Sequence, residues 1–536
     1  MKHILLAVAG LVLSLQLSAQ TPVFQWVYAE PVGWELNPSM TEHLVTVDGN
    51  RTVVSRMVLA VLDYNDLYGS YMIESHDPDG SLNISVPLFG RVHVNAIAAD
   101  AAGNVYVGGS FMKTLQLSND SLPNFGNVAD SFNINGFLFK LDTNSQIVWK
   151  RNLELTHPDL ETIADLRIDP QGNAWYAWNE WDAAHLVKLD ANGNDSGTPI
   201  DITGTRGISS FDFDPQGGVY IVGASEAGAV QLGTQTFNAT NTYNLFVAHV
   251  DSAQGNPWMT FAKDITFQSP KVDADPFGNA FVGGHVMDSL TLGNLQFNPP
   301  VWGTDFFLVK VNQQGNFIWG QQSPSMDSLS GEIEPASAKF IDTDTAGNVY
   351  LLANQRGVFN WGNGIESGND GAPLNKSKVL VMKFDGTDGT PLFALTSGLG
   401  STNTHQLAVD QHKNIYFTQT LTDTAAYGYF TMNIPMYENH FLMAKLSYLE
   451  DTTISVSIDN LVANTFNVFP NPASTHVVVP QELQESELSV MDVTGKQVAH
   501  HQAVGNTVNV ASLPSGVYML LFKSDRVRYT GRLVKQ

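Results

Sequence analysis

The chain has 536 residues, 45 glycines and no cysteine, and only 15% of its residues are charged. Its net charge is −25, and residues 21–463 carry this acidic excess, with 47 acidic against 20 basic side chains. Such a surface repels nucleic acid and anionic membranes, so we expect no nucleic-acid partner. Apolar residues alternate with period two far more often than they recur at helical spacing, which predicts an all-β protein of at least two domains.

Residues 1–19 have the pattern of a secretory signal peptide. Lys2 precedes an apolar run from residue 4 to residue 15, and the small residue Ala19 marks the expected cleavage site. A membrane anchor would need about 20 apolar residues, and this run is shorter. No later segment is apolar enough to span a bilayer, so we predict no transmembrane segment. Because the exported chain has no cysteine, packing alone must hold its fold together.

A short turn sequence, written DPQG in its clearest copies, recurs along the chain. Asp at the first position, Pro at the second and Gly at the fourth favour a type I turn, and the Gly supplies the positive φ that lets two strands pair as a hairpin. Lys413 stands in the last copy where the clear copies have Gly. The seven copies begin at Asp48, Asp100, Asp169, Asp214, Asp275, Asp344 and Asp410.

A second, strand-like repeat follows each copy of the first, and several of its copies lead into a strand that carries Trp149, Trp258 or Trp319. Two hairpins per unit make a four-stranded blade, and a unit length of about 60 residues fits a β-propeller better than the shorter repeats of a solenoid. The seven copies are Val58–Asp63, Phe137–Asp142, His185–Asp190, Phe246–Asp251, Phe307–Asn312, Leu380–Asp385 and Leu442–Ser447.

The last of these copies, Leu442–Ser447, is followed by no partner strand. Phe24–Glu30 opens the mature chain, has Trp26 at the aromatic position, and has no strand before it. We therefore expect these two segments to pair, which closes a seven-bladed β-propeller over residues 20–447 and protects both edges. The repeats resemble the β-propeller repeats of secreted Bacteroidota proteins, a resemblance that implies a fold but no particular activity.

After a linker at 448–463, residues 464–536 have short alternating strands and predict a small β-sandwich. The segments FNVFPNPAST, LSVMDVTGKQV, VASLPSGVYMLLF and RLVKQ resemble, in this order, the type A sorting domain of the type IX secretion system of Bacteroidota. The resemblance implies type IX secretion machinery as a partner and passage through the periplasm to the outer-membrane surface or the medium. Phe469, Met491 and Arg532 depart from the family pattern. The expected sorting-signal residues are Pro470, Asn471, Pro472, Gly495, Lys496, Gly516, Tyr518 and Lys535.

Three turns carry an extra acid two residues before the turn aspartate, at Asp212, Asp273 and Asp342. A turn-capping role is the favoured interpretation. A calcium site stays open as an alternative, although calcium needs six to eight oxygen ligands and no closing Glu follows these turns. We predict no other cofactor.

The segment Asn173–His185 concentrates three tryptophans beside Glu180 and Asp182. Indole rings beside carboxylates can form a sugar-binding platform. In a strand, however, Trp175 and Trp178 point to opposite faces, which favours inter-blade packing. The lysines that recur in register at the second repeat are expected at solvent-facing blade edges: Lys140, Lys188, Lys310, Lys383 and Lys445.

No H-E-x-x-H, G-x-S-x-G or P-loop sequence occurs, so we predict no catalytic residues. The favoured function is a non-enzymatic binding or adhesion protein with a glycan or protein ligand. The alternatives are a polysaccharide hydrolase or lyase with a pocket on the propeller axis and acids from several blades, and a structural component of a surface layer.

Overall fold

The computed structural model is all β, and its described part contains no helix, so it contains none that could cross a membrane. The chain divides into two compact units, Met1–Leu449 and Glu450–Gln536. The expected signal peptide with Ala19, nearly all of the linker, and Gly495 and Lys496 lie outside the described residues. These are 21–32, 43–47, 51–63, 66–118, 120–125, 134–154, 162–263, 269–286, 289–298, 305–324, 331–368, 376–398, 400, 402–434, 438–448, 464–466, 468–479, 487–491, 497–502, 507–523 and 528–536.

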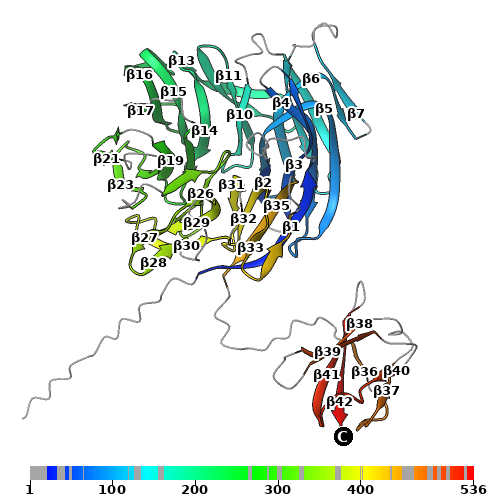
Figure 1. The fold of residues 1–536 in the computed structure, drawn as a ribbon. Helices are drawn as coiled ribbons and strands as arrows, with labels where there is room; N and C mark the ends of the chain where they lie inside the picture. The colour runs from blue at the N-terminus through cyan, green and yellow to red at the C-terminus, as the bar shows by residue number, and fades with distance from the viewer. Residues whose placement is uncertain are drawn as a thin grey trace, which may run out of the picture. The chain divides into compact units, whose positions relative to one another are not determined.

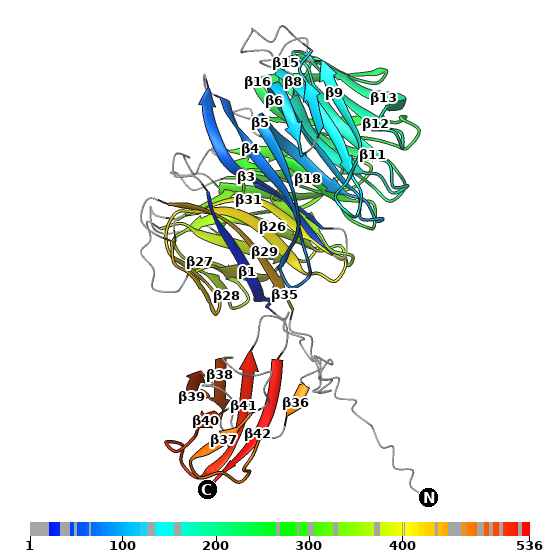
Figure 2. The ribbon, with the colours of Figure 1, turned by 90° about the vertical axis from the view of Figure 1, so that its right-hand side faces the viewer.

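The first unit is the predicted seven-bladed β-propeller, whose antiparallel blades follow one another in chain order (Figures 1 and 2). Blades 1 and 2 consist of β2 (Leu44–Val47), β3 (Thr52–Asp63), β4 (Asp66–His76), β5 (Leu82–Ala99), β6 (Val105–Leu117), β8 (Ile134–Leu141) and β9 (Ile147–Glu154). Blades 3 and 4 consist of β10 (Thr162–Ile168), β11 (Ala174–Asn179), β12 (Ala183–Leu189), β13 (Asp195–Thr203), β14 (Gly207–Phe213), β15 (Val219–Leu232), β16 (Gln235–Val250) and β17 (Trp258–Lys263).

The remaining three blades are separate sheets. They consist of β18 (Lys271–Ala274), β19 (Ala280–Val286), β22 (Asp305–Val311) and β23 (Phe317–Gln322); β25 (Ile341–Thr343), β26 (Val349–Arg356), β29 (Lys378–Phe384) and β30 (Pro391–Thr396); and β31 (Thr402–Val409), β32 (Ile415–Leu421), β35 (Asn439–Ser447) and β1 (Val23–Val32). Short strands lie beside or between them: β7 (Asp120–Pro123), β20 (Leu290–Leu292), β21 (Leu295–Phe297), β24 (Glu332–Pro335), β27 (Phe359–Gly362), β28 (Ile365–Ser367), β33 (Ala425–Tyr427) and β34 (Phe430–Met432).

The blades form a closed ring. Their first strands contact one another in an unbroken circle, in the order β2, β5, β10, β14, β18, β25, β31 and back to β2. β1 pairs with β35 along its whole length, with Val27 opposite Ala444, which is the closure expected from the sequence. The outer strand of the last blade therefore comes from β1, the first described strand of the chain, and Figure 1 shows the two strands side by side.

Two pairs of blades are merged into continuous sheets, which the sequence did not predict. β5 is 18 residues long, so its first half completes blade 1 by pairing with β4 and its second half begins blade 2 by pairing with β6. Blades 3 and 4 join where Ile202 pairs with Leu232 at the end of the long β15–β16 hairpin.

The six described turns of the first repeat have the predicted chemistry, whereas the copy at Asp48 lies outside the described residues. In the blade 2 turn, the N–H of Gly103 donates to Asp100 O at 2.9 Å, and an Asp100 carboxylate oxygen accepts the N–H groups of Ala102 and Asn104. Gly103 has a φ of 81°. Lys413 adopts the same left-handed conformation, with a φ of 65°, so the turn geometry persists in the copy that lacks Gly.

The assignment of Val58–Asp63 to the third strand of blade 1 was wrong. These residues extend the second strand, β3, and the third strand is β4. The third-to-fourth-strand turn of this blade is instead the DPDG sequence at 77–80, where the Gly80 N–H donates to Asp77 O at 2.9 Å. This turn has the same Asp-Pro-x-Gly chemistry as the first repeat, so the sequence already indicated a hairpin at this position.

The recurring tryptophans lock one blade to the next. Each lies on the fourth strand of its blade, with its ring against the turn glycine between the third and fourth strands of the following blade. A Cβ atom on Gly193, for example, would lie 2.5 Å from the ring of Trp149. The four pairs are Trp26 with Gly80, Trp149 with Gly193, Trp258 with Gly315, and Trp319 with Gly389. The recurring tryptophans therefore pack between neighbouring blades.

The three extra acids do not cap their turns, which corrects the favoured interpretation. The turn aspartate does so, as Asp214 shows by accepting the N–H of Gln216 at 2.9 Å and of Gly218 at 2.8 Å. The extra acid on the same strand, Asp212, reaches blade 5 and accepts the N–H of Ala274 at 2.8 Å.

Related contacts occur at neighbouring blade interfaces, and we call Asp165, Asp212, Asp273 and Asp342 the axial carboxylates. Asp342 accepts the Val409 N–H of the next blade at 2.6 Å. Asp273 lies 2.7 Å from the Nζ atom of Lys339, which also contacts Asp342 at 2.7 Å. Asp165 accepts the Ser210 hydroxyl at 2.9 Å. Each carboxylate therefore joins its own blade to the following one.

Two of the five recurring lysines are buried and not at solvent-facing blade edges, which corrects that expectation for them, whereas Lys140, Lys188 and Lys445 are partly exposed. Lys310 and Lys383 are each 7% exposed, and their Nζ atoms lie 2.9 Å from the turn aspartates Asp275 and Asp344 of their own blades. Each also lies over the aromatic ring of the second strand. A buried cation needs such a partner, because desolvation without one is costly.

In its described residues, the second unit is a small β-sandwich of a five-stranded and a two-stranded sheet. Its core contains Leu488, Val490, Val508 and Leu520, all at most 2% exposed. The strands are β36 (Asn464–Phe466), β37 (His476–Val478), β38 (Glu487–Met491), β39 (Gln497–Gln502), β40 (Thr507–Asn509), β41 (Gly516–Lys523) and β42 (Arg528–Lys535).

A matched pair of glycines in blade 3 tests the tryptophan lock. Gly172 and Gly193 have φ angles of 82° and 83°, but a Cβ atom on Gly172 would meet nothing within 4 Å. Gly172→Ala should therefore cost only the left-handed backbone strain, about 1 kcal/mol. Gly193→Ala must also displace Trp149, an overpacking cost of about 1–3 kcal/mol more. Thermal melts of the two variants check this, and equal losses would contradict the lock.

The pH dependence of stability tests the axial contacts. Burial and the charge of Asp273 raise the pKa of Asp212 to about 7, against about 3.9 in an unfolded chain. Because the folded pKa is the higher one, this group stabilises the fold at acid pH, and the contribution is lost as pH rises through 7. Asp212→Asn can still accept the Ala274 N–H. It should melt a few degrees above the wild type at pH 8 and equally at pH 4.

Asp251 is the control for that measurement, because its pKa is shifted in the opposite direction to that of Asp212. Hydrogen bonds, chiefly from the Gly255 N–H, lower the pKa of Asp251. Asp251→Asn should therefore lose stability at pH 8 and lose less as the pH falls below 4. An Asp212→Asn protein that melts below the wild type at pH 8 would contradict the account of the axial contacts.

Candidate functional site

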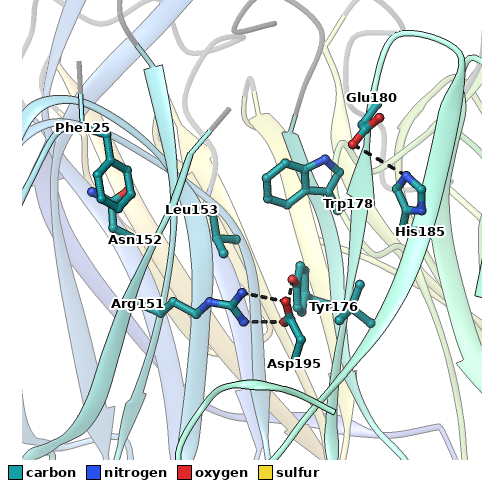
Figure 3. Close-up of a pocket in the computed structure, with 10 residues that line it drawn as sticks. Phe125, Arg151, Asn152, Leu153, Tyr176, Trp178, Glu180, His185 and Asp195 are labelled. Carbon is teal, nitrogen blue, oxygen red and sulfur yellow. Dashed lines mark hydrogen bonds and ion pairs between the residues drawn. The ribbon is translucent and has the colours of Figure 1, made fainter. Parts of the chain in front are cut away.

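A pocket of about 410 Å³ lies between blade 2 and blade 3. This volume falls in the range of about 300–1,000 Å³ that is typical of small-molecule sites. We call it the inter-blade pocket. Its lining comes from the end of β9, from β11 to β13, and from the segment after β7: Phe125, Arg151, Asn152, Leu153, Tyr176, Trp178, Glu180, His185, Val187 and Asp195 (Figure 3).

Strand alternation turns these side chains toward each other. Trp149, Arg151 and Leu153 occupy alternate positions of β9 and share the face that looks toward blade 3. Tyr176 and Trp178 are likewise two residues apart on β11 and line the opposite wall. The contact of Trp149 with Gly193 also joins blade 2 to blade 3. The two walls of the pocket therefore belong to blades that pack directly against each other.

The floor of the inter-blade pocket is an ion pair between the blades. Arg151 binds both carboxylate oxygens of Asp195, with Nη2 at 2.7 Å from Oδ2, and the Tyr176 hydroxyl donates to Oδ1 at 3.0 Å. Burial opposes ionisation of Asp195, but the Arg151 hydrogen bonds and charge outweigh it and lower the Asp195 pKa. Burial and the Asp195 charge raise the pKa of Tyr176, so its phenol stays a donor.

The walls are apolar and hold two unsatisfied polar atoms. Figure 3 shows Phe125 and Trp178 on either side of Leu153. Phe125 is 58% exposed. Among the described residues, the buried Trp178 Nε1 donor and the buried Asn152 Oδ1 acceptor find no hydrogen-bond partner. Buried polar atoms without a partner are rare in folded proteins and call for an explanation.

The rim carries negative charge. Glu180 Oε1 lies 3.7 Å from Nε2 of His185, and Nδ1 of the same ring lies 2.6 Å from Asp201 Oδ1. Both carboxylates are about half exposed, so they remain accessible to solvent. His185 is thereby held between two acids at the edge of the inter-blade pocket.

The structure separates the three tryptophans that the sequence placed together. Trp175 faces blade 4, where its ring packs on Phe213 with centroids 5.4 Å apart, as the packing interpretation predicted. Trp178 lines the inter-blade pocket, and Trp181 is 58% exposed. Sequence reasoning missed Arg151 and Asp195. They lie 44 residues apart in the chain and come together only because blade 2 packs against blade 3.

No group of three or more His, Asp or Glu side chains within the described ranges has the geometry to hold a metal ion. The axial carboxylates in particular are engaged by the next blade. The calcium alternative therefore gains no site from these residues.

The sorting-signal residues of the second unit lie near its C-terminal strand. Pro470, Asn471 and Pro472 are exposed. The Asn471 side chain donates to Arg532 O at 2.8 Å and accepts the Val534 N–H at 2.8 Å, so it fastens this loop to β42. Gly516 begins β41, the Tyr518 hydroxyl donates to Pro514 O at 2.9 Å, and Lys535 is 8% exposed.

The chain resembles several solved structures at low sequence identity. A protein from Lactobacillus plantarum is 11% identical with a TM-score of 0.38, over 73% of this chain and 99% of that chain. PorZ, a surface component of the type IX secretion system of Porphyromonas gingivalis, is 10% identical with a TM-score of 0.16, over 95% and 100%. An auxiliary nutrient binding protein from Bacteroides thetaiotaomicron is 7% identical with a TM-score of 0.26, over 77% and 100%. At these scores, none of them bears on function.

The C-terminal unit gives the specific match. No curated protein matches the chain in sequence. Residues 467–536 match the family described as the secretion system C-terminal sorting domain. The chain therefore joins a β-propeller to a secretion system C-terminal sorting domain, which sends it through the type IX secretion system to the cell surface.

Proposed function

We propose that this surface protein is a non-enzymatic binding protein whose inter-blade pocket holds a saccharide. The observation that carries the proposal is the combination in one pocket of aromatic walls, Phe125 and Trp178, with a polar floor, Arg151, Tyr176 and Asp195. A pyranose ring has C–H-rich faces and hydroxyl edges, so it needs both kinds of surface at once.

The charges of the site favour a neutral saccharide over an anionic one. Asp195 neutralises Arg151, so the floor offers no free cation. Glu180 and Asp201 add negative charge at the rim. Residues 21–463 also carry a net acidic excess, and like charge repels an acidic ligand.

The axial hydrolase alternative is less well supported. The structure does bring acids from several blades together, and a carboxyl with a pKa of about 7, such as Asp212, could act as a general acid. The axial carboxylates, however, are bound by backbone N–H groups or by Lys339 of the next blade. These bonds fit a role in joining blades.

A glycan array tests the proposed function. The protein purified after secretion should bind neutral glycans and release no product from them. Trp178→Ala should weaken this binding at least about tenfold. Phe277→Ala removes an aromatic ring that is 67% exposed on blade 5, away from the inter-blade pocket, and should leave binding unchanged.

Trp178 also packs against Met112 and Ile134, so Trp178→Ala can weaken binding by destabilising the fold. A second pocket variant separates these two effects. Glu180→Gln changes a half-exposed side chain and should alter glycan affinity without lowering the melting temperature. Two results would reject the proposal: binding that neither pocket variant changes, or turnover of a bound glycan by the wild type.

A further inference from the structure

Six of the seven blade interfaces are closed in one of two ways. The interfaces of blades 1 and 2 and of blades 3 and 4 lie inside continuous sheets. At four others, a tryptophan of the fourth strand lies against the turn that joins the third and fourth strands of the next blade. Within the described part of the chain, the interface of blades 6 and 7 has neither arrangement, so a different contact must close it.

The closure of the ring causes this exception. The third and fourth strands of blade 7, β35 and β1, come from opposite ends of the first unit, so no turn joins them. A tryptophan on β30 of blade 6 would have no turn carbonyl to receive its N–H, whereas Trp319 of blade 5 donates to Gly386 O of blade 6 at 3.3 Å. The chain instead has Phe393, a ring without a donor, at this position. Its cross-strand partner is Lys383, which recurs in register with Lys310, the partner of Trp319.

Tyr448 occupies the place of the missing turn. It directly follows β35, and its ring lies edge-on to Phe393, with the ring centroids 6.2 Å apart. Lys383 lies over the same ring, with its Nζ atom 5.2 Å from the centroid, a cation–π arrangement. Tyr448 therefore reaches from blade 7 back onto two strands of blade 6, β29 and β30, and packs against a hydrophobic core that contains residues of both blades.

The hydroxyl of Tyr448 adds directed hydrogen bonds to the same blade. Asp344 accepts the Tyr350 hydroxyl at 3.2 Å, and Tyr350 is the donor there because an ionised carboxylate only accepts. The Tyr448 hydroxyl, 3.1 Å from that of Tyr350, is therefore the donor of the bond between the two tyrosines. Lys383 Nζ donates to the Tyr448 oxygen at 3.4 Å. Burial raises the pKa of Tyr448 to about 12, so its hydroxyl keeps this proton at neutral pH.

We infer that Tyr448 is a strap that closes the interface of blades 6 and 7 and thereby completes the ring at the last residues of the first unit. The inference is independent of the proposed function. Since the first unit ends at Leu449, the strap lies just before the chain that leads to the second unit. The ring is then complete at residue 448, so a cut behind Tyr448 leaves the propeller closed.

Tyrosine variants of the full-length protein test the strap. Tryptophan fluorescence reports on the propeller alone, because all 10 tryptophans precede residue 449. Tyr448→Ala should lower the thermal midpoint of this signal by about 3 °C or more. Tyr448→Phe keeps the ring but not the hydroxyl, so it should lower the midpoint by less. Tyr429→Ala is the matched control, because Tyr429 is fully exposed between β33 and β34, and it should leave the midpoint unchanged.

A double-mutant cycle shows whether the strap acts through blade 6. Phe393→Leu removes the ring against which Tyr448 lies, so Tyr448→Ala should cost less in this background than in the wild type. A Tyr448→Ala protein that melts like the wild type would overturn the inference. Equal losses from Tyr448→Ala in the two backgrounds would overturn it as well.

A cut behind the strap tests whether the ring is complete at residue 448. A protease recognition sequence inserted after Ser455 allows the folded full-length protein to be cut there. The midpoint of the tryptophan signal should be the same before and after the cut. A propeller that melts at a lower temperature once the chain is cut would show that its closure depends on residues beyond Tyr448, which contradicts the inference.

Discussion

The antiparallel pairing of β1 with β35 is the constraint on which the rest of the first unit depends. It supplies the last blade with its outer strand and joins segments more than 400 residues apart. β1 also carries Trp26, whose ring lies on Gly80 of blade 1 and whose indole N–H donates to Pro78 O at 3.0 Å. β1 therefore supplies both the fourth strand of blade 7 and the tryptophan through which blade 7 contacts blade 1. Because the chain has no cysteine, non-covalent contacts alone keep this ring closed.

The contacts between blades also explain how a functional pocket can form there. Trp149 locks blade 2 onto blade 3 at the turn end of β9. Two and four residues further along the same face, Arg151 and Leu153 become the floor and wall of the inter-blade pocket. The strand that holds the blades together thus also positions the site, and the Arg151–Asp195 pair spans both blades. We expect ligand affinity to depend on an intact ring for this reason.

Sequence reasoning succeeded where the signal is local. The Asp and Gly of each turn, the strand alternation and the closing strand could all be predicted, because hairpin chemistry is confined to neighbouring residues. It failed where a role depends on the neighbouring blade. Asp212 was assigned to its own turn but bonds to Ala274. No local sequence pattern marks Arg151 and Asp195 as partners. The sequence placed Trp175 and Trp178 on opposite faces of a strand, but only the structure shows that Trp178 faces blade 2 and Trp175 faces blade 4.

A disulfide trap measures the central claim, ring closure by β1, most directly. The chain has no cysteine, so Val27→Cys with Ala444→Cys introduces the only pair that can form a bond. Mild oxidation of the folded protein should consume both thiols within one molecule, speed its migration on a non-reducing gel by closing the long loop, and raise its melting temperature, while each single variant keeps its thiol. Two thiols that stay free in the folded double variant, or that link only separate molecules, would show that β1 does not close the ring.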